Sequence, residues 1–344
     1  MNRNARSLSD AVTPIAFVRY ITKAYEAYGL SFDAALREAR IVPHLLDDPA
    51  SRVTAEQFEK LSGYAMRELD DEALGWFSRR LPWGSHGMIC RAAVTAPDLG
   101  VALKRWCRCH GLLTEDIALT LSVKAGAASI TIHERCVTAA LREFCLVSVL
   151  RMAHGFACWL IDSRIPLIDL TFPYAQPEHG SAYGAMFPGR ARFEAAHAGF
   201  SFDAQYLSLT PVRDETATRQ MLQKALQLTV LQYRRDRLLV DRVRMLLKSH
   251  LASSTHTNDL PNAEALSEML AISSRTMHRQ LQEEGASLQE IKDAVRRDYA
   301  IDLMQRTNRP LKQIAHMAGF RNEKSFSRAF KQWEGSAPSD FRKR

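Results

Sequence analysis

The sequence lacks the features that mark several common classes of protein. No charged N-terminal segment precedes an apolar stretch, and no uninterrupted apolar run approaches the ~18 residues that a membrane span needs. The glycine-rich phosphate-binding loops and the G-x-S-x-G and H-E-x-x-H motifs are also missing. These absences favour a soluble, cytoplasmic protein without a membrane partner, a cofactor or an enzymatic activity.

A disulfide framework is missing as well. The chain has six cysteines, and their spacing shows no paired pattern, so we expect reduced thiols. Cys107, Cys109 and His110 nevertheless bring soft ligands close together, and His154 and Cys158 share one side of a helix. A metal-responsive or thiol-redox role for these residues therefore stays open as an alternative.

Positive charge is concentrated toward the C-terminus. Of the net charge of +8, residues 240–344 carry +5, with 18 Lys and Arg against 13 Asp and Glu. A chain of 344 residues fits two domains. A basic C-terminal domain suits contact with nucleic-acid phosphates, although a solvated basic face would carry the same charge.

The first two-thirds of the chain alternates helical and strand patterns. Residues 13–82 are predicted to be mostly helical, with a helix-start signature at Thr54 and Gln57. Strand-like segments are predicted later, at 117–123, 128–133, 168–172, 191–195, 200–203 and 207–209. The first two form a predicted hairpin, and a long apolar helix over 141–161 follows. Such an α+β domain can enclose a small-molecule cavity.

From residue 239 onward only helices are predicted, and the stretch His316–Arg342 is the most informative. Gly319 separates a short helix from a second helix whose Phe326, Phe330 and Trp333 share one face. The opposite face is polar and cationic. A helix-turn-helix with such a face is suited to reading a DNA major groove.

A first unit of the same kind is predicted upstream. Its support helix covers Ala263–Leu270 after Asn262, its turn is at Ala271, and its reading helix starts at Ser273. Between the two units, Ser287–Gln305 is predicted to be one helix of ~28 Å, close to the ~34 Å of one DNA turn. This length would place the two reading helices in successive major grooves.

The second unit resembles that of the AraC/XylS transcription regulators. The matching positions are Ala315, Gly319, Phe320, Ser325, Phe326, Arg328, Phe330, Lys331, Gly335, Pro338, Phe341 and Arg342. The resemblance implies contacts to bases or phosphates from the outward faces of both reading helices. The candidate DNA-binding residues are Ser274, Arg275, His278, Arg279, Gln282, Glu323, Lys324, Ser327, Arg328 and Lys331. Ala271 departs from the family pattern, in which glycine is common at the first turn.

The N-terminal region resembles the ligand-sensing domain of AraC-type regulators of amino-acid and amine catabolism. The resemblance rests on three segments, Gly84–Met88, Pro97–His110 and Phe200–Leu207. It implies control by a small-molecule effector, and dimerisation. Residues that could contact the effector are Trp83, His86, Arg105, Trp106 and His154, although a packed or surface position is the commoner explanation for each of these residue types.

We therefore predict an α+β ligand-sensing domain followed by an all-α DNA-binding domain with two helix-turn-helix units joined by a long helix. The predicted segments are a disordered N-terminus (1–12), an effector-binding domain (13–212), a helical linker (213–236) and the DNA-binding domain (237–344). The predicted function is an effector-responsive transcription activator, cytoplasmic and nucleoid-associated. Its predicted partners are promoter DNA, the effector, RNA polymerase and a second copy of the chain. An enzyme domain fused to a DNA-binding tail, or a DNA-architectural protein without a ligand, would also be compatible with this sequence.

Overall fold

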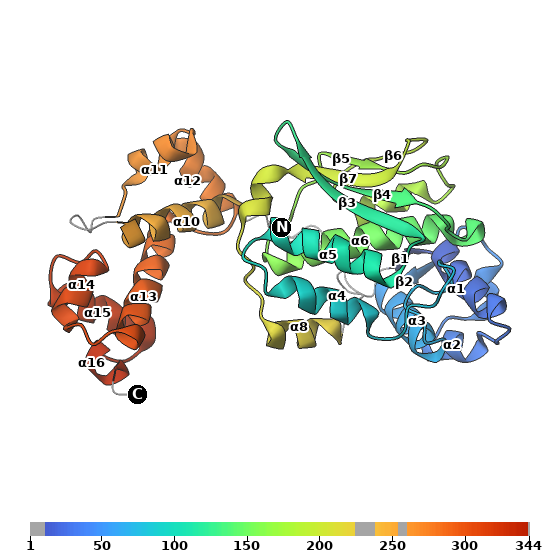
Figure 1. Ribbon diagram of the computed structural model, residues 1–344, viewed down its shortest axis with the longest axis horizontal. Helices are drawn as coiled ribbons and strands as arrows, with labels where there is room; N and C mark the ends of the chain where they lie inside the picture. Colours follow the sequence, from blue (N-terminus) through green and yellow to red (C-terminus); the bar gives the residue numbers. More distant parts are fainter. Residues whose placement is uncertain (1–10, 224–237, 254–259, 343–344) are drawn as a thin grey trace. The chain divides into compact units, whose positions relative to one another are not determined.

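The chain divides into two compact units, residues 1–236 and 237–344. The structure is a computed structural model that describes residues 11–223, 238–253 and 260–342. In these ranges the first unit contains helices and two sheets, and the second contains helices alone (Figure 1). The predicted fold class is confirmed.

The described part of the first unit begins with a two-stranded sheet and helices, and a five-stranded sheet with its covering helices follows. Its strands are β1 (Ala11–Pro14), β2 (Arg52–Thr54), β3 (Ile117–Lys124), β4 (Ala127–Glu134), β5 (Asp169–Thr171), β6 (Ala191–Arg192) and β7 (Ala198–Asp203). Its α-helices are α1 (Ile15–Ala27), α2 (Asp33–Glu38), α3 (Ala55–Glu68), α4 (Ser85–Val94), α5 (Leu99–Leu113), α6 (Arg142–Leu160), α7 (Tyr183–Met186) and α8 (Glu215–Leu222). Four short 3-10 helices are η1 (Pro43–Leu46), η2 (Ala139–Leu141), η3 (Gly180–Ala182) and η4 (Ala204–Ser208).

The main sheet has five strands in the order β3-β4-β7-β5-β6, and only β5 and β6 are parallel. The predicted hairpin is confirmed as β3–β4, with Ala125 and Gly126 at positive φ in its turn. Alternate residues of β4 and β7, such as Ile130 and Phe200, are buried, whereas Thr131 faces the other side. Helices α5 and α6 lie along one face of this sheet, and α4 and α8 lie beyond α5 (Figure 1).

Helix α6 is the core helix of the first unit. By length and composition alone, the stretch Ala139–Leu160 could cross a membrane. This finding differs from the expectation that no apolar run in the sequence approaches the length of a membrane span. However, 83% of its most apolar window is buried inside the unit. This burial is that of a helix enclosed by its own domain, which explains why it is hydrophobic on nearly all sides.

Some predicted strands were wrong. Residues 207–209 belong to or follow η4, because the Asp203 carboxylate accepts the Gln205 backbone N–H at 2.8 Å and turns the chain. The strand predicted over 191–195 is only two residues long, and the β1–β2 pair was not predicted at all. Of the predicted linker helix, α8 is described, whereas residues 224–236 lie outside the described residues, as do residues 1–10 of the N-terminal segment.

Three consecutive acidic residues hold the loop before α4. Asp71, which is buried, accepts the backbone N–H groups of Ala73, Gly75 and Leu81 and the Tyr28 hydroxyl, all at 2.7–2.9 Å. The Glu72 carboxylate accepts the N–H groups of Gly84 and His86, and Asp70 accepts that of Trp83. Residues 82–84 and the first turn of α4 therefore lie against carboxylates of their own chain.

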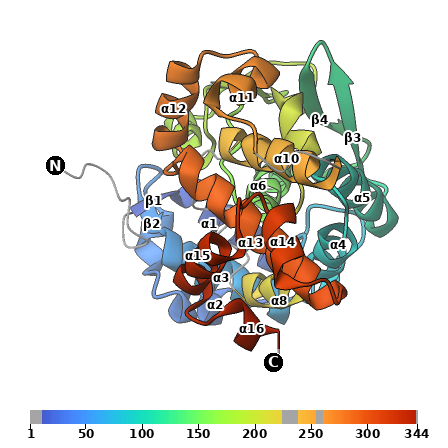
Figure 2. The same cartoon turned by 90° about the vertical axis from the view of Figure 1, so that its left-hand side faces the viewer.

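The second unit has two hydrophobic cores that share one long helix. Its helices are α10 (Leu238–Ser253), α11 (Ala263–Leu270), α12 (Ser274–Glu283), α13 (Leu288–Arg306), α14 (Leu311–Met317), α15 (Glu323–Glu334) and α16 (Pro338–Phe341). The first half of α13 packs with α10, α11 and α12, and its second half packs with α14, α15 and α16. Tyr299 contacts both cores, and α13 runs between the two helix pairs (Figure 2).

Both helix-turn-helix turns have the same backbone geometry. Ala271 ends α11 at φ 53° and Gly319 follows α14 at φ 80°, so both are left-handed. In each turn the next residue donates its N–H five residues back, from Ile272 to Ser267 at 3.0 Å and from Phe320 to Ala315 at 2.9 Å. The alanine at the first turn is thus strained by its Cβ, and the turn itself is retained.

We expect Ala271→Gly to stabilise the second unit by about 0.5–1 kcal/mol, because glycine adopts the left-handed conformation without a steric penalty. The matched control is Ala294→Gly inside α13, where the same substitution should destabilise by about 1 kcal/mol. Calorimetric unfolding of the full chain measures both shifts. A loss of stability in Ala271→Gly would contradict the strained turn.

Candidate nucleic-acid interface

Helix α12 separates an inward apolar face from an outward polar face. Met277 and Leu281 are fully buried in the first core, and the Ser273 hydroxyl caps the helix at the Thr276 N–H. The predicted contact residues on the opposite side are exposed or partly exposed, namely Arg275, His278, Arg279 and Gln282. Ser274 has its hydroxyl in a hydrogen bond with Ser267 at 3.1 Å.

Helix α15 repeats this arrangement in the second core. Phe326 and Phe330 are fully buried, and Asn322 caps the helix by accepting the Ser325 N–H at 2.8 Å. The predicted contact residues Glu323, Lys324, Arg328 and Lys331 are exposed, whereas Ser327 is half-buried. The two reading helices therefore present similar surfaces, each cationic apart from Glu323 and Glu334 at the two ends of α15 and Glu283 at the end of α12.

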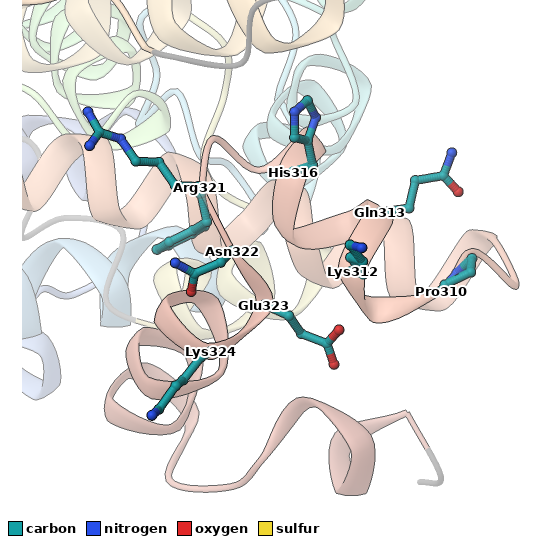
Figure 3. A pocket seen from close by; sticks show the side chains of 9 residues that line it. Pro310, Lys312, Gln313, His316, Arg321, Asn322, Glu323 and Lys324 are labelled. Carbon is teal, nitrogen blue, oxygen red and sulfur yellow. The ribbon is translucent and has the colours of Figure 1, made fainter.

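A groove of about 870 Å³ lies where α14 meets the start of α15 (Figure 3). Lys312 and His316 line it from α14, and Arg321, Glu323 and Lys324 line it from the turn and α15. Gln313 and His316 were not among the predicted contacts. Their signal in the sequence was the exposed face of α14, on which Lys312 and His316 stand four residues apart.

The acidic end of α12 has a structural partner. Glu284 accepts the backbone N–H groups of Leu239 and Val240 at the start of α10, at 3.1 and 2.8 Å. The first backbone N–H groups of α10 have no hydrogen-bond partner within the helix, and the Glu284 carboxylate accepts from two of them. Its negative charge also complements the positive N-terminal end of the helix dipole. This contact fixes α10 to the end of the first reading helix.

The five predicted effector residues differ in their exposure. Trp83 and Arg105 are exposed; Arg67 lies 5.6 Å from the Trp83 ring, and Arg105 donates to the Ala92 carbonyl and to Thr95. The other three residues pack inside the domain. Trp106 is fully buried in α5, His86 is half-buried in α4, and His154 is buried in α6.

Burial holds three histidines of this domain, His86, His110 and His154, in the neutral form. It lowers the pKa of His154 to about 3, with Arg151 adding to the effect, and the pKa of His86 and His110 to about 4. The His154 Nε2 atom lies 2.8 Å from the Ile165 carbonyl oxygen and 3.6 Å from the Cys158 sulfur. The predicted placement of His154 and Cys158 on one helix face is confirmed, and that face lies in the core.

The cysteines give no ligand set for a metal. Cys90, Cys107, Cys145 and Cys158 are buried, and burial raises the pKa of Cys107 to about 12. Throughout the described ranges, no three His, Cys, Asp or Glu side chains are grouped so that they could hold a metal ion. The metal-responsive alternative therefore has no structural support in this part of the chain.

Two family models match the chain along its length. A model described as the arabinose-binding domain of AraC transcription regulators matches residues 29–211, which is more than half of the chain. The chain belongs to the AraC family. A helix-turn-helix domain model matches residues 266–344, which include both helix pairs. As a member of the AraC family, the protein is a DNA-binding transcription regulator with an effector-binding N-terminal domain, and it is not an enzyme.

The chain is similar to several regulators. The ornithine utilization regulator of Pseudomonas aeruginosa is 27% identical over 332 residues, 96% of this chain and 96% of that protein. The transcriptional regulator VqsM of the same species is 25% identical over 59% of this chain and 61% of its own length. Among solved structures, the transcriptional regulator CdpR from Pseudomonas aeruginosa aligns with 96% of this chain and 98% of its own, at 19% identity and a TM-score of 0.33.

Acid should destabilise the first unit through its buried histidines. Because the folded pKa of His154 lies below the value of ~6.5 expected when unfolded, the unfolded chain binds more protons as the pH falls. The contribution of the neutral His154 side chain to the free energy of unfolding is fully present above pH ~6.5. Its loss should lower that free energy by about 2 kcal/mol between pH 7.5 and 5. In His154→Gln the pH dependence should weaken by this amount, measured as the unfolding free energy of the full chain. An unchanged pH profile would contradict the neutral buried histidine.

Proposed function

We propose that this AraC-family chain binds a promoter operator by placing α12 and α15 in two successive major grooves, and that it activates transcription when a small amine or amino acid binds its N-terminal domain. The proposal is carried by one observation: two turns of equal geometry present two exposed cationic helices from a shared helix. Helix α13 has 19 residues, so it spans ~28 Å, near the ~34 Å of one DNA turn.

Helix α12 carries the residues that we assign to base reading. Arg275 and Arg279 lie on one face, and a guanidinium can bind both acceptors of a guanine edge. His278 and Gln282 share that face and would contact neighbouring bases. Ser274 is partly occupied by its contact with Ser267, so we assign it to the start of the interface, near the phosphates.

Helix α15 carries a mixture of base and phosphate contacts. We assign Lys324 and Arg328 to base edges or phosphates, Ser327 to the same surface and Lys331 to a phosphate. Glu323 carries the opposite charge and would be repelled by phosphate, so we assign it to a base edge, where a carboxylate can accept from the cytosine amino group.

The effector class follows the name of a relative that matches 96% of this chain, a regulator of ornithine utilization. We carry over only the chemistry, an amine or amino acid. Trp83, His86, Arg105, Trp106 and His154 remain candidates for contacting it. We also propose a homodimer in the cytoplasm that associates with the nucleoid and contacts RNA polymerase.

Sequencing of genomic fragments retained by the purified full-length protein tests the DNA-reading geometry. We expect enrichment of a site with two short tracts about one helical turn apart. The experiment is run with and without ornithine, so that effector-dependent binding is also detected. Enrichment of a single tract would contradict the use of both reading helices.

Arg279→Ala should weaken binding to the selected site and relax preference at one base pair, a loss of about 1–3 kcal/mol of discrimination. Arg190→Ala, an exposed arginine of the first unit, is the matched control and should leave the base preference unchanged. Competition binding against sites with each base substituted measures the effect. Unaltered preference in Arg279→Ala would show that the base contacts of α12 are misassigned.

Lys331→Ala should weaken binding to all sequences alike, because a phosphate contact carries no base information. The slope of log affinity against log salt should fall by about one unit. Fluorescence titrations at several salt concentrations, with specific and scrambled duplexes, measure both quantities. A loss confined to the specific duplex would instead assign Lys331 to a base.

A further inference from the structure

An enclosed carboxylate at the start of α6 joins three elements of the first unit. The Glu143 Oε2 atom accepts the Tyr20 hydroxyl of α1 at 2.7 Å. The Oε1 atom accepts the Tyr183 hydroxyl at 2.8 Å and pairs with the His179 Nε2 atom at 2.6 Å. The side chains of Glu143 and His179 are each 15% exposed. The carboxylate is therefore enclosed but still within reach of solvent.

Aromatic rings surround the place that the His179 imidazole occupies. The Phe17 ring meets it edge to face with centroids 5.6 Å apart, and the Tyr183 ring stacks on it at 6.4 Å. Phe144 extends this wall, lying 5.8 Å from Phe17. A carboxylate among aromatic faces is the arrangement that binds an organic cation, through charge and ring quadrupole together.

The Glu143 carboxylate is held in its ionised form. Burial alone would raise the pKa of Glu143, but hydrogen bonds from His179 and Tyr20 outweigh it and hold the pKa below its usual range. Among the residues that the structure describes, His179 is the only basic side chain that contacts this carboxylate. A primary ammonium group carries a positive charge and three N–H donors, so it can pair with the Glu143 carboxylate in the place of the imidazole.

His179 reaches Glu143 from the connection between β5 and β6. Ala175, Gln176 and Glu178 are exposed. The backbone hydrogen bonds that start or end at residues 175–179 stay within the connection, such as Gly180 N–H to the Pro177 carbonyl at 2.8 Å. Within the described residues, the imidazole is therefore the hydrogen-bonding group that ties this stretch to α6.

We propose that the Glu143 carboxylate, walled by Phe17, Phe144 and Tyr183, is a binding site for the primary ammonium group of a small amine, and that His179 fills it as an internal substitute until the amine displaces it. This assignment rests on the proposed effector control and gives that effector its cationic group. Tyr20 and Tyr183 keep their hydrogen bonds to the carboxylate, and the ammonium donates to Oε1 in place of the imidazole.

Calorimetric titration of the full-length protein with 1,4-diaminobutane tests the site, with 1,4-butanediol as the uncharged probe of similar shape. We expect the diamine to bind and the diol to remain unbound. Glu143→Gln should weaken diamine binding at least about tenfold, because a charged acceptor is lost. His179→Ala should tighten it about threefold or more, because the internal competitor is removed.

Two matched variants separate this effect from a general loss of charge or of a histidine. Asp169→Asn removes a carboxylate on β5 that pairs with Arg192 on the neighbouring strand β6. His197→Ala removes an exposed histidine. Both should bind the diamine as the unsubstituted protein does. Equal binding of diamine and diol, or weaker diamine binding in His179→Ala than in the unsubstituted protein, would overturn the proposal.

Hydrogen exchange gives a readout that does not depend on affinity. If the amine displaces His179, backbone exchange should accelerate in residues 175–179 while α1 becomes more protected. Protection of both segments would mean that His179 stays in place, and it would overturn the displacement. The diamine could bind with faster exchange in residues 175–179 and greater protection of α1, yet leave DNA binding unchanged. That result would support the site and contradict the proposed effector control. Absence of diamine binding, with sequence-specific DNA binding retained, would overturn the site alone.

Discussion

The direction of each reading helix depends on the hydrogen bonds that close the turn before it. A support helix must end within one residue for the next helix to leave at the right angle, and a left-handed residue achieves this. At the first turn the residue is Ala271, whose conformation is unfavourable for any residue with a Cβ. The paired N–H groups of Ala271 and Ile272 compensate by capping α11. The two units thus share the geometry of this turn although they differ in the residue that forms it.

Carboxylates in this basic chain are used repeatedly as acceptors for backbone N–H groups. Asp71 and Glu72 organise the loop before α4, and Glu284 closes the start of α10. Asp98 and Asp214 cap α5 and α8. Held in this way, acidic groups stabilise the fold locally.

Sequence reasoning succeeded where the determining residues lie close together in the chain. The capping boxes at Thr54–Gln57 and Ser287–Glu290 involve residues three apart, and both are present in the structure. It failed where partners are distant: β1 pairs with β2 across some forty residues, and Tyr20 contacts Glu143 at a separation of 123. Helical spacing placed His154 and Cys158 on one face but could not show that this face is in the core. Burial depends on tertiary packing, which no local pattern records.

The two cores that share α13 have a consequence for how this domain can change during evolution. Each added or removed residue in a helix advances it by about 1.5 Å and turns it by about 100°. A single insertion in α13 would therefore rotate one helix-turn-helix unit relative to the other around the helix axis. Insertions in the loops between helices have no such effect. The length of α13 therefore sets the spacing between the two DNA tracts. Regulators of this architecture can exchange the residues that read each tract while that spacing stays the same.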